Sequence, residues 1–67
     1  MSTRIAFVHK GNFVADVPSS AQPLLDERVT LDGNDYVVIK REWGVETIDV
    51  HYHLREVILY VHITELP

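Results

Sequence analysis

The sequence contains no cysteine, which removes two common means of stabilising a small chain. Without thiols there are neither disulfide bonds nor thiolate zinc clusters, so a disulfide-stabilised secreted mini-protein is excluded. A chain of 67 residues buries only about 60% of the surface that its unfolded form exposes. Its stability must therefore come from efficient packing or from oligomerisation.

Long hydrophobic runs are also absent. No segment reaches the length of a transmembrane helix, and the first ten residues lack the apolar centre of a signal peptide. These features predict a soluble protein of the cytoplasm that does not associate with membranes. The same length predicts one domain, spanning residues 1–67.

Alanine is scarce, whereas Val, Ile, Thr, Phe, Tyr and Trp supply 25 of the 67 residues. Because β-branched and aromatic side chains suit a pleated, half-buried surface, the composition predicts an all-β fold. No stretch has the apolar spacing of an amphipathic helix. One helical turn within Pro18–Glu27 is the only exception considered, and there Leu24 and Leu25 could close the end of a barrel.

Turn-forming residues divide the chain into three hairpins. The first joins Arg4–His9 to Phe13–Val17 through Lys10-Gly11-Asn12. A three-residue loop, with Asn12 in the left-handed conformation, places His9 opposite Phe13. The apolar face of this hairpin would then consist of Ile5, Phe7, Phe13, Ala15 and Val17.

The second predicted hairpin joins Arg28–Leu31 to Tyr36–Trp43 through the turn residues Asp32-Gly33-Asn34-Asp35. Pairing Leu31 with Tyr36 gives a core face of Val29, Leu31, Tyr36 and Val38. The opposite face carries Arg28, Thr30, Val37, Ile39 and Arg41. A bulge near Lys40 could turn part of that face inward.

The third predicted hairpin joins Thr47–His53 to Glu56–Thr64 through a tight turn at Leu54-Arg55. Its core face would consist of Ile48, Val50, Tyr52, Val57, Leu59, Val61 and Ile63. A shift by one residue would bury charged and histidine side chains, so this register is favoured. Five or six short antiparallel strands in three hairpins predict a small barrel or a two-layer β structure. The barrel is favoured, because an open sheet of this size would leave two long apolar edges.

A resemblance supports the barrel. The string Val29-x-Leu31-x-Gly33-x-x-Tyr36-x-Val38, followed by Trp43, resembles the small SH3-like barrel proteins of tailed bacteriophages and prophages. The matching stretch covers roughly Pro18–Trp43. The resemblance implies an SH3-like barrel and a phage or prophage origin, and it implies no catalytic residue.

His51 and His53 are the most suggestive pair for chemistry, since alternate residues of a strand lie about 6.5–7 Å apart on one face. Glu56 and Asp49 could add ligands, and Asp49 with His51 could be part of a catalytic triad. An exposed strand face supplies neither the supporting hydrogen bonds of a metal site nor the pocket of an enzyme. We therefore expect no metal, no cofactor and no enzymatic activity.

A protein-contact face is the favoured functional feature. It would consist of Arg28, Val37, Ile39, Arg41 and Trp43, since Arg and Trp dominate binding hot spots. The same residues could instead cover the core. Lys40 with Arg28 and Arg41 also forms the one basic cluster, but ten acidic residues against six basic ones disfavour nucleic acid.

The sequence thus predicts a non-enzymatic protein-binding module, a phage accessory protein that engages a host or defence protein. A homo-oligomeric structural or assembly protein and a nucleic-acid-binding barrel are the alternatives. A small chain with an apolar outer stripe is expected to form a homodimer.

Overall fold

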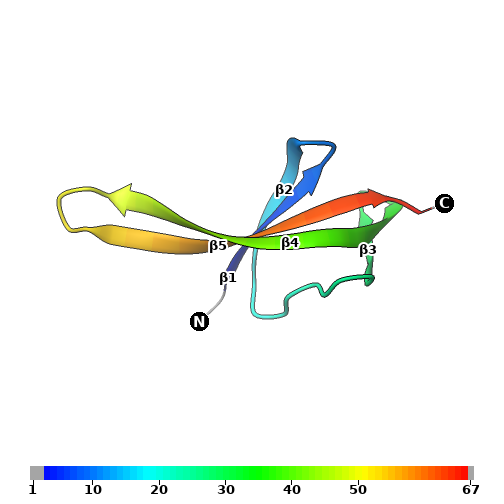
Figure 1. Cartoon of the computed structure of the whole chain (residues 1–67), viewed down its shortest axis with the longest axis horizontal. Helices are drawn as coiled ribbons and strands as arrows, with labels where there is room; N and C mark the ends of the chain where they lie inside the picture. The colour runs from blue at the N-terminus through cyan, green and yellow to red at the C-terminus, as the bar shows by residue number, and fades with distance from the viewer. Residues whose placement is uncertain (1–2, 67) are drawn as a thin grey trace.

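The computed structural model describes residues 3–66 and shows five strands and no helix in that range. The strands are β1 (Thr3–His9), β2 (Asn12–Ser19), β3 (Arg28–Leu31), β4 (Asn34–Asp49) and β5 (Leu54–Glu65). They form one sheet in the order β2-β1-β5-β4-β3, which curls into a half-barrel (Figure 1). The predicted all-β fold, consistent with a small barrel, is confirmed. Residues 3–66 include no helix with the length and apolar character to cross a membrane.

The centre of the sheet departs from the expected antiparallel arrangement, because β1 and β5 pair in parallel. The apolar run Ile5–Val8 in β1 is buried throughout. Buried residues on both faces are typical of strands at the centre of a sheet. The two ends of the chain, β1 and β5, therefore lie side by side in the middle of the sheet.

One face of the sheet, here called the core face, carries the main hydrophobic cluster. Its buried members are Ile5, Phe7, Val38, Leu59, Val61 and Ile63, with Ala15, Val29, Leu31 and Tyr36 packed against them. The opposite side, here called the outer face, carries the alternating residues of the same strands, among them Arg4 and Tyr60. Register therefore assigns every strand residue to one of the two faces.

The first hairpin has a tighter turn than predicted. Lys10 and Gly11 both have positive φ, 53° and 79°, which closes a two-residue turn of the kind favoured in hairpins. Phe13 consequently pairs with Val8, and a bulge after Phe7 restores the predicted pairing of Phe7 with Ala15. The predicted inward position of Phe13 and left-handed Asn12 are wrong, because the turn uses Lys10 instead.

The second hairpin also turns on two residues, Asp32 and Gly33, with φ of 51° and 82°. Val29 pairs with Tyr36 rather than with Val38, a shift of two positions. An even shift keeps every side chain on its face, so the predicted core set Val29, Leu31, Tyr36 and Val38 is confirmed. The bulge predicted near Lys40 is present between Val38 and Lys40.

The segment between β2 and β3 contains no helical turn. Leu24 and Leu25 are 55% and 57% exposed, so the prediction that they close a barrel end is wrong. Instead, the Asp26 N–H donates to Val38 O over 2.9 Å, and the Val38 N–H donates to Glu27 O over 3.0 Å. These bonds fasten the segment along the edge of β4.

The third hairpin has a different register from the predicted one. β4 continues to Asp49, with a second register shift between Thr47 and Asp49, and the turn comprises Val50–His53. The Asp49 carboxylate accepts the N–H groups of His51 and Tyr52 over 2.9 and 3.3 Å, which fixes this turn. Val50 and Tyr52 are therefore 76% and 82% exposed rather than buried. The second and third hairpins consequently share β4.

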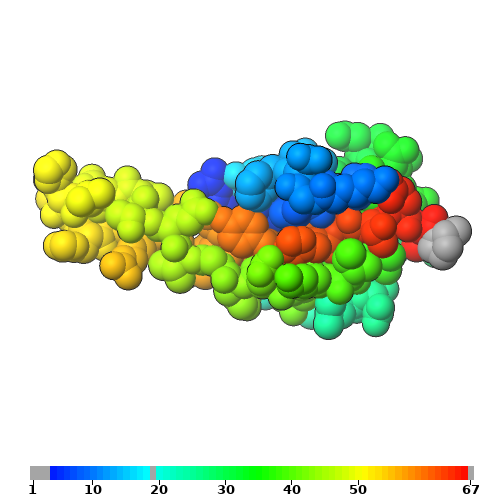
Figure 2. Space-filling view, turned by 45° about the horizontal axis from the view of Figure 1, so that its top comes forward, coloured from blue at the N-terminus to red at the C-terminus, as the bar shows by residue number. Residues whose placement is uncertain are grey.

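The outer halves of β4 and β5 project from the body as a two-stranded ribbon, here called the arm (residues 45–57). β1 pairs with β5 only from Ile58 onward, and β3 pairs with β4 only up to Val37. Figure 1 and Figure 2 show the ribbon extending beyond the other strands. It makes the molecule elongated, 46 × 24 × 19 Å.

Candidate functional site

The structure divides the five residues predicted to form one contact face. Arg28 and Val37 pair with each other on the outer face. Ile39 is the extra residue of the bulge and is 58% exposed. Beyond the bulge the alternation reverses. Arg41 therefore pairs with Val61 and Trp43 with Leu59, both on the core face. These five residues therefore do not share one face.

The same reversal separates the predicted basic cluster. Arg41 is half-buried, and its Nη2 donates to Gln22 Oε1 over 3.3 Å. Its Nε is buried without a partner among the described residues. Lys40 lies on the outer face, where its Nζ is 3.9 Å from Glu42 Oε1. The cations at 28, 40 and 41 thus form no continuous basic surface.

His51 and His53 lie in the exposed turn at the end of the arm rather than on a strand. The carboxylate of Asp49, considered above as a metal or triad partner, is occupied by the backbone of that turn. Within residues 3–66, no three His, Cys, Asp or Glu side chains come together as metal ligands would.

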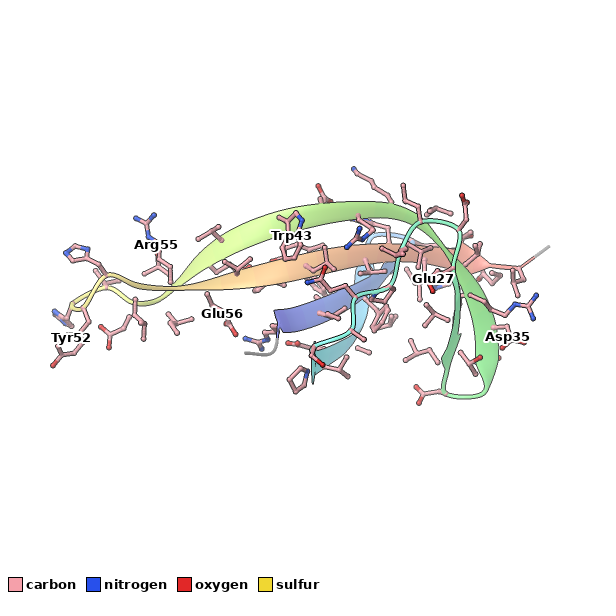
Figure 3. The ribbon with its side chains drawn as sticks, turned by 90° about the horizontal axis from the view of Figure 1, so that it is seen from below. Glu27, Asp35, Trp43, Tyr52, Arg55 and Glu56 are labelled. Carbon is pink, nitrogen blue, oxygen red and sulfur yellow. The ribbon has the colours of Figure 1, made fainter. Side chains whose placement is uncertain are left out.

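One side of the arm combines apolar residues with arginine. This surface, here called the basic face, comprises Trp43, Val45, Thr47, Arg55 and Val57. Trp43, Val45 and Val57 are 55%, 62% and 50% exposed. Arg55 makes no ion pair or hydrogen bond within the described part of the chain through its side chain, and Figure 3 shows it on the side of the ribbon opposite Glu56.

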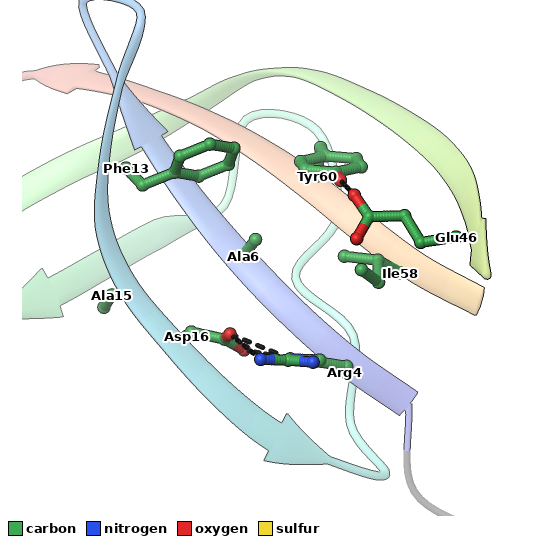
Figure 4. Close-up of a pocket in the computed structure, with 8 residues that line it drawn as sticks. All are labelled: Arg4, Ala6, Phe13, Ala15, Asp16, Glu46, Ile58 and Tyr60. Atoms are coloured by element: carbon green, nitrogen blue, oxygen red, sulfur yellow. Dashed lines mark hydrogen bonds and ion pairs between the residues drawn. The ribbon is translucent and has the colours of Figure 1, made fainter. Parts of the chain in front are cut away.

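The outer face is hollowed at the base of the arm by an open pocket of about 350 Å³. Its lining residues are Arg4, Ala6, Phe13, Ala15, Asp16, Glu46, Ile58 and Tyr60 (Figure 4). Ala6 and Ile58 are buried and provide an apolar floor. The rings of Phe13 and Tyr60 form one side, with centroids 5.9 Å apart and planes inclined by 44°. We call this the Phe13–Tyr60 pocket.

Carboxylates outnumber cations around this pocket. The Arg4 Nε donates to both oxygens of Asp16 over 2.9 and 2.8 Å, and its Nη1 donates to Glu56 Oε2 over 2.9 Å. The bonds from Arg4 lower the pKa of Asp16. Glu46 also lines this pocket, and Glu56 lines the adjoining hollow, so three carboxylates and one cation, Arg4, lie in this region.

The Tyr60 ring is held in place from two directions. Its hydroxyl donates to Glu46 Oε1 over 2.5 Å, and this bond raises the pKa of Tyr60. Beneath the ring lies Gly44, where an added Cβ would be 2.5 Å from Tyr60 Cε2. Glycine is thus needed here for close approach rather than for a turn.

Sequence reasoning missed the Phe13–Tyr60 pocket. It placed Phe13 in the core, considered Glu56 only as a possible metal ligand, and did not single out Tyr60 or Glu46. The pocket depends on the parallel pairing of β1 with β5 and on the arm register, both of which involve long-range contacts.

Comparison with known proteins adds no relative: no family model matches the chain, and neither a curated protein nor a solved structure is significantly similar to it. The resemblance to phage barrels therefore stays a prediction.

Proposed function

We propose that the chain is a protein-binding module rather than an enzyme, and that it contacts its partner through the arm. The supporting observation is where the exposed apolar side chains gather. Of thirteen large hydrophobic residues exposed in the described part of the chain, seven lie between residues 43 and 57. They are Trp43, Val45, Ile48, Val50, Tyr52, Leu54 and Val57.

An arm of this kind gains from a partner. A two-stranded ribbon without a third strand or a covering layer is at best marginally stable in water. Trp43 and Val45 supply the aromatic and aliphatic area that interface cores use, and Arg55 is of a type enriched in hot spots. Binding would bury this area while the body of the sheet holds the base of the arm.

The charges of the basic face indicate which kind of partner surface would bind it. Arg55, with Arg41 at the base, contributes positive charge, and no carboxylate shares that face in the described arm. Since opposite charges favour association and like charges oppose it, the partner offers an apolar surface bordered by carboxylates. The engagement of a host or defence protein by a phage accessory protein remains part of this proposal.

The experiment is affinity capture from a bacterial lysate with the wild-type chain and with Val45→Asp. Captured proteins are identified by mass spectrometry and then tested as purified proteins. We expect the substitution to abolish capture, because it places a charge within the apolar part of the basic face.

Val14→Asp is the matched control, since Val14 is 44% exposed on β2, outside the arm. It should leave capture intact. Equal capture by wild type and Val45→Asp would show that the arm is not the contact surface.

A further inference from the structure

The two sides of the arm and its base carry opposite charge. The core side has Arg41 and Arg55, whereas the outer side has Glu46 and Glu56 in the arm and, at its base, Glu42 close to Lys40. The outer side also borders the Phe13–Tyr60 pocket. The chain thus contains both a basic apolar surface and an acidic aromatic one, and the second has the properties that the proposed function requires of a partner.

We propose that the arm binds a second copy of this chain, and that the Arg55 guanidinium of one copy occupies the Phe13–Tyr60 pocket of the next. This inference rests on the proposed function and names the partner of the same arm. It also assigns the pocket as a binding site for a guanidinium group.

The pocket suits a guanidinium for three reasons. Two aromatic rings form one side of it, and a guanidinium stacks favourably on an aromatic face. Glu46, bonded through Oε1 to Tyr60, offers its other carboxylate oxygen at one end of the opening, and Asp16, whose two oxygens accept from Arg4, adds negative charge at the other (Figure 4). The buried floor of Ala6 and Ile58 can receive the aliphatic part of an arginine side chain.

Among the described cations, Arg55 is the one placed to reach another molecule. Three of them already have a carboxylate within 4 Å: Arg4 has Asp16, Lys10 has Glu65 and Lys40 has Glu42. Arg41 is half-buried against Gln22. Arg28 and Arg55 remain, and only Arg55 is carried outward by the projecting arm (Figure 3).

The contact is head-to-tail. Arg55 lies on the core face of the ribbon and the pocket lies on the outer face, so one neighbour cannot cover both. Each copy therefore uses its arm on one neighbour and its pocket on another, a heterologous contact that extends into rings or open series.

The test is sedimentation of the purified chain over a range of concentrations at low salt. We expect mass to increase with concentration. Arg55→Ala and, separately, the pocket variant Phe13→Ala/Glu46→Gln should each weaken self-association at least about tenfold, the effect of losing a charged hot-spot contact. Arg28→Ala, the other unpaired arginine of the described chain, should associate as wild type does.

Mixing the two defective proteins provides the decisive result. Arg55→Ala retains a pocket and the pocket variant retains an arm, so an equimolar mixture should form a heterodimer and nothing larger. A wild-type chain that stays monomeric, an Arg55→Ala chain that associates normally, or a mixture that stays monomeric would overturn the inference. Loss of capture by Val45→Asp in the lysate experiment, combined with a monomeric pure chain, would contradict this inference alone and leave the proposed function standing.

Discussion

At the scale of single residues, the outer face depends on the absence of a side chain at Gly44. The Tyr60 ring covers this glycine and is held there by its bond to Glu46. Aromatic cover of a strand glycine compensates for the packing that glycine cannot provide. The Phe13–Tyr60 pocket therefore owes its shape to a residue that does not line it.

Gly44→Ala should accordingly destabilise the chain by about 1–3 kcal/mol, the usual cost of inserting a methyl group where no space exists. Denaturant unfolding measures this cost. In a Tyr60→Ala background the same change should become neutral or stabilising, because alanine restricts the unfolded chain more than glycine does. Equal costs in both backgrounds would show that the ring does not exclude the methyl group.

A second property at this scale is the acid response of Glu65. Its own backbone N–H and the His9 ring hold the pKa of this carboxyl at about 2, below its ordinary value of 4.5. A lowered pKa in the folded state contributes stability that is fully present above pH 4.5 and is lost as the pH falls toward 2.

We therefore expect Glu65→Gln to flatten the dependence of melting temperature on pH between 4.5 and 2. Thermal melts in that window test it. Glu27→Gln is the control, since Glu27 is exposed in the segment before β3. Curves for Glu65→Gln and wild type that fall in parallel would refute the role of this carboxyl.

At the scale of elements, the arm and the body differ in what holds them together. Leu59 and Val61 are fully buried in β5, the central strand of the sheet, whereas Val50 in the arm turn is 76% exposed. Leu59→Ala should cost about 2–4 kcal/mol through lost burial and the resulting cavity. Val50→Ala should cost less than about 0.5 kcal/mol. Chemical denaturation distinguishes them, and a similar cost for both would place the arm turn in the core.

The elements also show how far sequence reasoning reaches. Val29, Leu31 and Val38 were assigned correctly to the core because alternation survives an error of two residues in a turn. Val50 and Tyr52 were misplaced because their alternation was extended through residues that Asp49 draws into a turn. Local side-chain to backbone bonds of this kind compete with the strand pattern and are not visible in periodicity.

The candidate site was less accessible to sequence reasoning than the fold. The five proposed contact residues were placed on one strand face, and the bulge at Ile39 divides them between two faces. That bulge was predicted, together with the possibility that it turns part of the face inward, but the contact face was still defined from all five residues. A pocket formed by β1, β2, β4 and β5 needs the strand order, and strand order is set by long-range packing rather than by local propensity.

At the scale of the whole molecule, the chain combines a packed body with an arm whose backbone pairs with neither β1 nor β3. The hydrogen bond from Arg4 of β1 to Glu56 connects the base of the arm to the body. The buried core residues belong to β1, to Val38 of β4 and to β5 from Ile58 onward, so the core stops where the arm begins. The arm therefore adds to the 46 Å length of the molecule without adding to its core. This architecture suits a body that folds without the arm, and an arm that binds a partner protein.

Replacing residues 48–54 with Asn-Gly tests this division. Thr47 and Arg55 already face each other across the ribbon, and Asn-Gly forms the two-residue turn that such a pair accepts. None of the removed residues is buried, so the free energy of unfolding should change by less than about 0.5 kcal/mol. Small-angle scattering should show a shorter particle than the 46 Å wild type. Denaturant unfolding supplies the second measurement, and a loss of more than about 2 kcal/mol would show that the body requires the end of the arm.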